Sequence, residues 1–168
     1  MFSLERNGVG VQRLMQKQCD IMELKDTLFC LAGRNDAYPW FIFISRKTEL
    51  NKGTYQLDLF SPWRISKNGK VVVTSEDMFR YSNGESFRDW DETERNRYDD
   101  KIEALLEKRK HVVKNVQVSE LYDLRIELSD NVILEVKVMD RYQINWAVTN
   151  IDLDDGICYE INCCKKLS

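Results

Sequence analysis

Tyr55–Ser75, YQLDLFSPWRISKNGKVVVTS, is the stretch that decides how this chain folds. Apolar and polar residues alternate from Tyr55 to Leu59, which is the period of a strand with one buried face. Pro62 has no backbone N–H to give to a ladder, so the strand has to bend, bulge or lie at a sheet edge there. Asn68-Gly69 predicts a type I′ hairpin turn, because that turn needs positive φ at both central positions. We therefore expect a bent strand followed by a tight hairpin.

The bend also supplies the candidate binding residues, which are Arg64, Trp63 and Asp58. The alternation after Pro62 sends Trp63 and Arg64 to opposite faces, and bends of this kind often re-aim functional side chains. Together with Lys67 and Lys70, Trp63 and Arg64 form a small basic and aromatic patch, which in a single-strand binder would hold phosphates and stack on bases. The alternative is that Trp63 belongs to the core and Arg64 pairs with an acid.

Three parts of the same stretch resemble a group of small bacterial proteins of unknown function: Tyr55-Gln56-Leu57, Pro62-Trp63-Arg64-Ile65 and Gly69-Lys70-Val71-Val72-Val73. That group shares Y-x-L-x-x-x-x-P-W-R-I followed by G-K-x-x-V. Its members often carry His, Gln and Cys just before the proline, and this chain has none of them from Asp58 to Ser61. The resemblance therefore transfers no catalytic residue. It implies a bacterial protein of the cytoplasm.

Composition narrows the class of protein. A chain of 168 residues with 43% apolar residues predicts one globular domain, 1–168. The net charge of −3 argues against a general nucleic-acid binder, which needs a surplus of Lys and Arg. The longest clean apolar run, Trp40–Ile44, is too short to cross a bilayer, and Met1–Gly10 does not resemble a signal peptide. We expect a cytoplasmic protein without membrane contact.

The five cysteines are an odd number without metal-type spacing, which predicts reduced thiols. Cys163 and Cys164 could form a strained disulfide, bind a soft metal or have no role. His111 is the only histidine, so two-histidine metal sites are excluded, and we expect it to act as a base at a helix C-terminus. We expect no metal and no cofactor.

Two acidic groups have alternative interpretations. Asp89, Asp91, Glu92, Asp99 and Asp100 surround Trp90 and could supply an acid and a base, but a solvated helix start also explains them. Asp152, Asp154 and Asp155 precede Gly156 and predict a turn, because the ligand order of a calcium loop is missing. Nucleotide-binding, hydrolase and zinc-protease motifs are absent from the sequence.

Several strands are predicted before the bend. Gly10–Met15 and Cys19–Leu31 are candidates, and Ala32–Asp36 is a loop by composition. Trp40–Ile44 is aromatic and β-branched, which predicts a strand buried on both faces. After the hairpin, the polar stretch between Phe79 and Trp90 predicts a surface loop.

One helix is predicted near residues 92–110. Asp91 to Glu94 suggests a capping box, and Lys108 to His111 places bases at the negative end of the helix dipole. Between them, one apolar stripe is expected, formed by Tyr98, Ile102, Leu105 and Leu106.

The last third predicts antiparallel strands again. Leu124–Leu128 and Val132–Val138 alternate around a three-residue loop, a register that places Arg125 opposite Glu135 and Asp123 opposite Lys137. Trp146–Asn150 and Ile157–Asn162 form a final pair. The expected fold class is α+β, with about seven to ten mostly antiparallel strands and one principal helix.

Without a catalytic set, the leading hypothesis is a non-enzymatic interaction protein whose partner is another protein, as an immunity or antitoxin-like protein would be. The first alternative is a small-ligand or enzyme domain with a cleft beside Pro62, where Arg64 grips an anion and Asp58 lies nearby. A further alternative is binding of RNA or single-stranded DNA.

Overall fold

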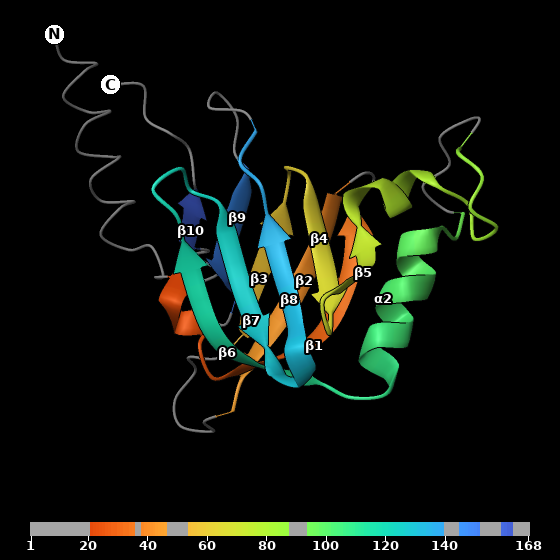
Figure 1. Ribbon diagram of the computed structural model, residues 1–168. Coiled ribbons are helices and arrows are strands. Elements are labelled where there is room, and N and C mark those ends of the chain that lie inside the picture. Colours follow the sequence, from red (N-terminus) through yellow and green to blue (C-terminus); the bar gives the residue numbers. More distant parts are fainter. Residues whose placement is uncertain are drawn as a thin grey trace, which may run out of the picture.

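The computed structural model describes residues 21–35, 38–46, 54–87, 94–139, 145–151 and 159–162. The strands are β1 (Thr27–Asn35), β2 (Tyr38–Ser45), β3 (Thr54–Leu59), β4 (Trp63–Lys67), β5 (Lys70–Thr74), β6 (His111–Val118), β7 (Leu124–Leu128), β8 (Val132–Val136), β9 (Trp146–Asn150) and β10 (Tyr159–Asn162). They accompany one α-helix, α2 (Arg97–Glu107), and three short 3-10 helices, η1 (Ile21–Leu24), η2 (Ser75–Phe79) and η3 (Ser129–Asn131). The expected α+β class with a mostly antiparallel sheet is confirmed (Figure 1).

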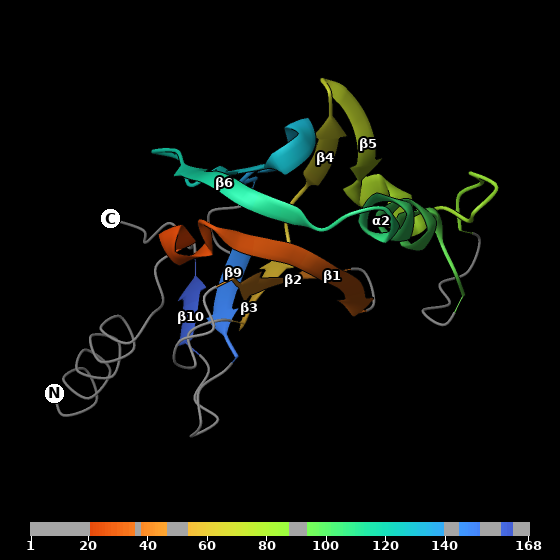
Figure 2. The same ribbon diagram turned by 90° about the horizontal axis from the view of Figure 1, so that it is seen from below.

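The ten strands form one sheet in the order β10-β9-β3-β2-β1-β6-β7-β8-β4-β5. Its two halves meet where β1 joins β6 through only two residue pairs, Leu28–Val112 and Phe29–His111. The sheet folds over at this joint, so that β10, β9, β3, β2 and β1 form a first layer and β6, β7, β8, β4 and β5 a second layer (Figure 2). The apolar faces of the two layers enclose the core.

The chain crosses from the first layer to the second between Leu59 and Trp63, at the predicted bend. Pro62 accepts a hydrogen bond from the Lys137 backbone N–H at 2.9 Å, which fixes the crossing to the second layer. Beyond it, Trp63 and Ile65 are buried, whereas Arg64 is exposed on the outer face, as the alternation predicts.

The predicted hairpin turn is confirmed. Asn68 and Gly69 have φ angles of 50° and 76°, so both take the left-handed conformation that a type I′ turn requires. The return strand is β5, which pairs with β4 from Lys67–Lys70 to Arg64–Thr74.

Trp63 connects three parts of the core. Its ring makes edge-on contacts with Phe41 of β2 and Tyr98 of α2, each with centroids 5.8 Å apart. Tyr98 in turn donates its hydroxyl hydrogen to the Gly33 carbonyl of β1 at 2.8 Å. Burial of this hydroxyl raises the pKa of Tyr98. The two layers and the helix are therefore packed through one aromatic chain.

Helix α2 begins later than predicted, at Arg97. Its N-cap is Asn96, which accepts a hydrogen bond from the Asp99 backbone N–H at 3.0 Å, and the Asp99 carboxylate accepts one from the Asn96 N–H at 3.1 Å. The predicted capping box fails at Glu94, which precedes the helix, while 91–93 lie outside the described residues. The expected apolar stripe is confirmed: Tyr98, Ile102 and Leu105 are buried, and Leu106 packs partly against the core.

Ion pairs attach α2 to both layers. Arg34 of β1 holds both carboxylate oxygens of Asp99, at 3.0 and 3.1 Å. On the other side, Lys101 contacts both oxygens of Asp77 in η2 at 3.0 Å, and Asp77 is buried. The helix therefore closes the gap between β1 and β5 on one side of the core (Figure 1).

The loop predicted from Ala32 is wrong as far as Asn35, because β1 continues to that residue. Gly33 is tolerated in this strand since its cross-strand neighbour is Trp40, whose indole lies where a side chain at position 33 would stand. The beginning of the predicted Cys19–Leu31 strand is also wrong, because Ile21–Leu24 forms η1. The candidate strand Gly10–Met15 lies outside the described residues.

β2 only partly fits the prediction of burial on both faces. Phe41 and Phe43 belong to the core, and Ile42 is also buried on the other face. Ile44 is 42% exposed, however, so nothing in the described part of the chain fully covers the outer face there.

The register predicted for the last third is confirmed. Leu128 pairs with Val132, and Arg125 lies opposite Glu135. β9 and β10 pair as expected, and β9 also joins β3 in the first layer. The turn predicted at Asp154 to Gly156 lies outside the described residues.

Two features are absent from the described residues. They contain no helix that is both long and apolar enough to span a bilayer, and no cluster of three or more His, Cys, Asp or Glu side chains suited to a metal ion. Cys30, the one cysteine among them, has a free thiol. Cys163 and Cys164 lie outside the described residues.

Candidate functional site: a charged groove on the second layer

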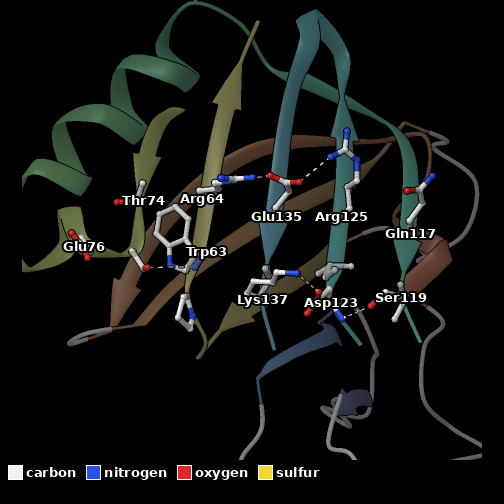
Figure 3. A pocket seen from close by; sticks show the side chains of 15 residues that line it. Trp63, Arg64, Thr74, Glu76, Gln117, Ser119, Asp123, Arg125, Glu135 and Lys137 are labelled. Atoms are coloured by element: carbon white, nitrogen blue, oxygen red, sulfur yellow. Dashed lines mark hydrogen bonds and ion pairs between the residues drawn. The ribbon is translucent and has the colours of Figure 1, made fainter. Parts of the chain in front are cut away.

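The outer face of the second layer carries a row of polar side chains that runs across five strands. The register places Thr74 of β5, Arg64 of β4, Glu135 of β8, Arg125 of β7 and Gln117 of β6 side by side (Figure 3). Arg64, Arg125 and Glu135 point outward, because their neighbours along each strand are buried in the core. Five strands therefore present their side chains to the same strip of surface.

Glu135 is the centre of this row. Its Oε2 accepts a hydrogen bond from Arg64 Nε at 2.8 Å, and its Oε1 accepts one from Arg125 Nη1 at 2.9 Å. Arg125 also donates from Nε to Glu127 Oε1 at 3.2 Å. Both Nη groups of Arg64 remain without a hydrogen-bond partner among the described residues. The row thus holds two fixed guanidinium groups with donors to spare.

A second charged pair lies at the ends of the same strands. Lys137 Nζ and Asp123 Oδ2 are 2.6 Å apart, and Asp123 Oδ1 accepts from the Val138 backbone N–H at 2.9 Å. The Asp123 N–H donates to Ser119 Oγ at 3.0 Å. These bonds order the β6–β7 connection beside the row (Figure 3).

Row and pair border one groove of about 790 Å³, which extends from Pro62 at the crossing to Ser119 after β6. On the β5 side it is closed by Ser75 and Glu76 at the start of η2. A groove of this size lies within the range of about 300–1,000 Å³ that small ligands occupy, and it can equally take a few residues of a peptide.

The cations protrude from the groove and the carboxylates are recessed. The Arg64 and Lys137 side chains are 57% and 72% exposed, against 30% for Glu135 and 25% for Asp123. The hydrogen bond from Arg64 holds the pKa of Glu135 below its usual value, despite an opposing effect of desolvation. The hydrogen bond from Lys137 likewise lowers the pKa of Asp123. Both acids are therefore ionised and paired at neutral pH. The lining holds three cations, Arg64, Arg125 and Lys137, against three carboxylates, Glu76, Asp123 and Glu135, so the surplus of positive charge is local to the row, where two arginines share Glu135.

The three predicted binding residues do not form one site. Arg64 lies in the groove. Trp63 borders it, but its side chain is 4% exposed and packs in the core, as the alternative interpretation of the patch holds. Asp58 points outward from the first layer, where Gln56 Nε2 donates to it at 3.0 Å. Because the chain changes layer after Leu59, Asp58 and Arg64 lie on opposite outer faces.

Arg125, Glu135, Asp123 and Lys137 were predicted as cross-strand pairs and not as members of a site. Their own hairpin is local, so its register follows from the sequence. Their meeting with Arg64 depends on the pairing of β4 with β8, whose paired residues Arg64 and Glu135 are 71 positions apart. The sequence offers one signal, the surplus of acid on the polar face of this hairpin, where Asp123, Glu127 and Glu135 outnumber Arg125 and Lys137.

His111 is remote from the groove. It starts β6, is 2% exposed, and its Nε2 lies 3.4 Å from the carbonyl oxygen of Leu105 in the last turn of α2. The predicted contact with the helix C-terminus is therefore confirmed, although the residue is part of a strand.

The described residues thus form an antiparallel sheet that folds over into two layers. Helix α2 closes one side of the core, and a charged groove lies on the outer face of the second layer. Comparisons of the chain with protein-family models, with curated proteins and with solved structures find no match. What the protein does must be argued from the groove itself.

Proposed function

We propose that the chain is a non-enzymatic interaction protein that binds an acidic segment of a partner protein in the groove. The observation that carries the proposal is the row of Arg64 and Arg125 on a shared Glu135. Because Glu135 holds both guanidinium groups in place, little side-chain entropy is lost when a carboxylate arrives. The spare N–H groups of Arg64 suit the two oxygens of such a carboxylate.

The groove is poorly equipped for acid–base catalysis. Glu135 and Asp123 have their pKa below the usual range, so each is a weak base and a poor proton donor near neutral pH. Its lining, within the described residues, contains no histidine and no cysteine. Binding is therefore favoured over chemistry.

Site-specific photo-crosslinking in cells that produce the protein tests the proposal. We expect a photoreactive residue at Gln117, in the groove, to capture a partner that one at Gln56, on the outer face of the first layer, does not. Arg64→Gln should abolish that capture. The partner's crosslinked segment should contain Asp or Glu.

Arg95→Gln is the matched control. Arg95 is 56% exposed and pairs with Asp100 and Glu103 of the helix, so the substitution removes the same charge from a similarly exposed ion pair outside the groove. With the purified partner, Arg64→Gln should weaken binding about tenfold or more, as expected for loss of charge-assisted hydrogen bonds. Equal losses from both variants would refute the groove as the binding site.

The volume of the groove is also suited to a second candidate function, the binding of a small anionic ligand by Arg64. Thermal-shift measurements with a library of anionic metabolites would detect it, and any stabilisation should disappear in Arg64→Gln. The nucleic-acid alternative is disfavoured, because buried Trp63 offers no stacking surface to a base. A binding affinity that is steep in salt would revive it.

A further inference from the structure

A second hollow lies at the opposite end of β4. The groove borders Trp63, the first residue of this strand, whereas the hollow borders Lys67, the last. It has a volume of about 630 Å³ and lies between the final turn of α2 and the turns that follow β4 and β7. The two sites share no lining residue.

Cations dominate this hollow. Lys67, Lys101, Lys108 and Arg109 line it, against one carboxylate, Asp130. Lys101 is neutralised by Asp77 and Arg109 by Asp130, with an Nη1–Oδ1 distance of 2.8 Å. Across the described part of the chain, neither Lys67 nor Lys108 has an acid within ion-pair distance. Two lysines without an acidic partner therefore line the same space.

A buried polar pair also borders the hollow. His111 Nδ1 and Asp130 Oδ2 are 3.5 Å apart, and both atoms are buried without a hydrogen-bond partner among the described residues. The other ring nitrogen faces the Leu105 carbonyl oxygen, so acceptors stand on both sides of the imidazole. A neutral imidazole has one N–H and cannot donate to both. Buried polar groups left open in this way are uncommon, and a bound water or ion is one of the explanations for them.

We propose that this hollow, the anion pocket, binds a phosphate-type oxyanion carried by a small molecule. The ammonium groups of Lys67 and Lys108 would hold its oxygens, and the remaining N–H groups of Arg109 would add to them. The negative end of the α2 dipole opposes an anion here, but its effect is limited to the last turn and is screened. The uncompensated charges of Lys67 and Lys108, together with the occupied Leu105 carbonyl, outweigh it.

Inorganic pyrophosphate is a suitable probe, titrated at constant ionic strength against sodium chloride. His111 is the only histidine of the chain, so its ring gives one unambiguous NMR signal. We expect this signal to move and to saturate, together with the backbone amides of Lys67 and Arg109. A signal that stays in place, or that moves equally with chloride, would overturn the proposal.

Charge-neutralising variants separate this pocket from general attraction. Lys67→Gln and Lys108→Gln should each weaken pyrophosphate binding about tenfold, the value of one charge-assisted contact. Lys114→Gln is the matched control, since Lys114 is exposed on β6, away from the pocket, and the change in net charge is the same. An equal loss in Lys114→Gln would mean that only the overall charge matters.

The pocket and the groove can be tested independently. Arg64→Gln should leave pyrophosphate binding unchanged, and Lys67→Gln should leave capture of a partner in the groove unchanged. A pyrophosphate affinity that Arg64→Gln reduces as much as Lys67→Gln would place the anion in the groove and contradict the anion pocket.

Discussion

Glu135 decides the electrostatic character of the groove because it lies between two arginines. Without this carboxylate, Arg64 and Arg125 would repel each other and lose their common anchor. With it, one oxygen orients each guanidinium group, and the positive charges stay above the negative one. The single acid therefore makes the row more rigid without reversing its outward charge.

We predict that Arg64→Ala raises the pKa of Glu135 and that Arg125→Ala raises it less, because the hydrogen bond from Arg64 is the larger cause of the lowered pKa. Carboxyl-carbon NMR titrations measure both values. Folding lowers the pKa of this carboxyl group, so the group stabilises the folded protein at pH values above its ordinary pKa of 4.5. This stabilisation is lost as the pH falls through the folded pKa.

The difference in unfolding free energy between the wild-type protein and Arg64→Ala should accordingly shrink below about pH 4.5. Arg95→Ala, whose ion pairs lie on the helix, should leave the Glu135 titration unchanged. If the pKa of Glu135 were the same in Arg64→Ala as in the wild-type protein, the row would not be formed in solution.

At the scale of elements, Asn96 stabilises α2 through both polar atoms of its side-chain amide. The Asn96 Oδ1 caps the helix through the Asp99 N–H, and its Nδ2 donates to the Met78 carbonyl of η2 at 3.1 Å. Asn96→Ala should lower the unfolding free energy by about 2–3 kcal/mol, the sum of a lost cap and a buried carbonyl left unpaired. Urea denaturation at an unchanged m-value measures this loss.

Asn83 provides the control for this prediction. It also caps a backbone N–H, that of Glu85 at 2.9 Å, but in an exposed loop. Asn83→Ala should cost no more than about 0.5 kcal/mol, as surface substitutions do. If both variants lose similar stability, the buried position of Asn96 has no special weight.

An unbroken period made the β7–β8 hairpin predictable in detail from the sequence, whereas a bulge hid β6; the β4–β5 hairpin also has a bulge, but its Asn68-Gly69 turn still predicted it. The β7–β8 hairpin alternates throughout, so even its cross-strand charge pairs followed. β6 was not predicted, because a bulge between Val113 and Asn115 breaks its alternation of buried and exposed residues. The buried residues are therefore His111, Val113 and Val116. The start of the helix was not predicted correctly, because Asn96 is as good an N-cap as the acidic residues before it.

The candidate site was predictable only to the extent of Arg64. The sequence places this residue beside a bend on an outward face, and the structure keeps it there. Its partner depends on which distant strand pairs with β4, and many acids on polar faces could have met it. Strand pairing at long range is set by the whole core, which a local pattern does not describe.

At the scale of the whole molecule, the described residues form two layers around a shared core. The direct joint between β1 and β6 is short, so the layers are held mainly by side chains: Trp63 on Phe41 and Tyr98, and the ion pairs of α2 to β1 and η2. Because these contacts link both layers to one helix, neither layer retains a covered apolar face when the other opens. The groove on the second layer is therefore rigid only while the first layer is in place.

This dependence predicts that both layers unfold as one unit. Trp63→Phe shortens the ring that joins them and should lower the unfolding free energy by about 1–3 kcal/mol. Native-state hydrogen exchange should report the same loss at Leu57 and Val148 in the first layer and at Ile126 and Leu134 in the second, because all four amides would open with the global transition. Phe60→Leu, at a half-exposed ring in the crossing segment, should change these values far less. A loss confined to the second layer would show that the layers unfold separately, and the groove would then have to be treated as the property of a five-stranded sheet alone.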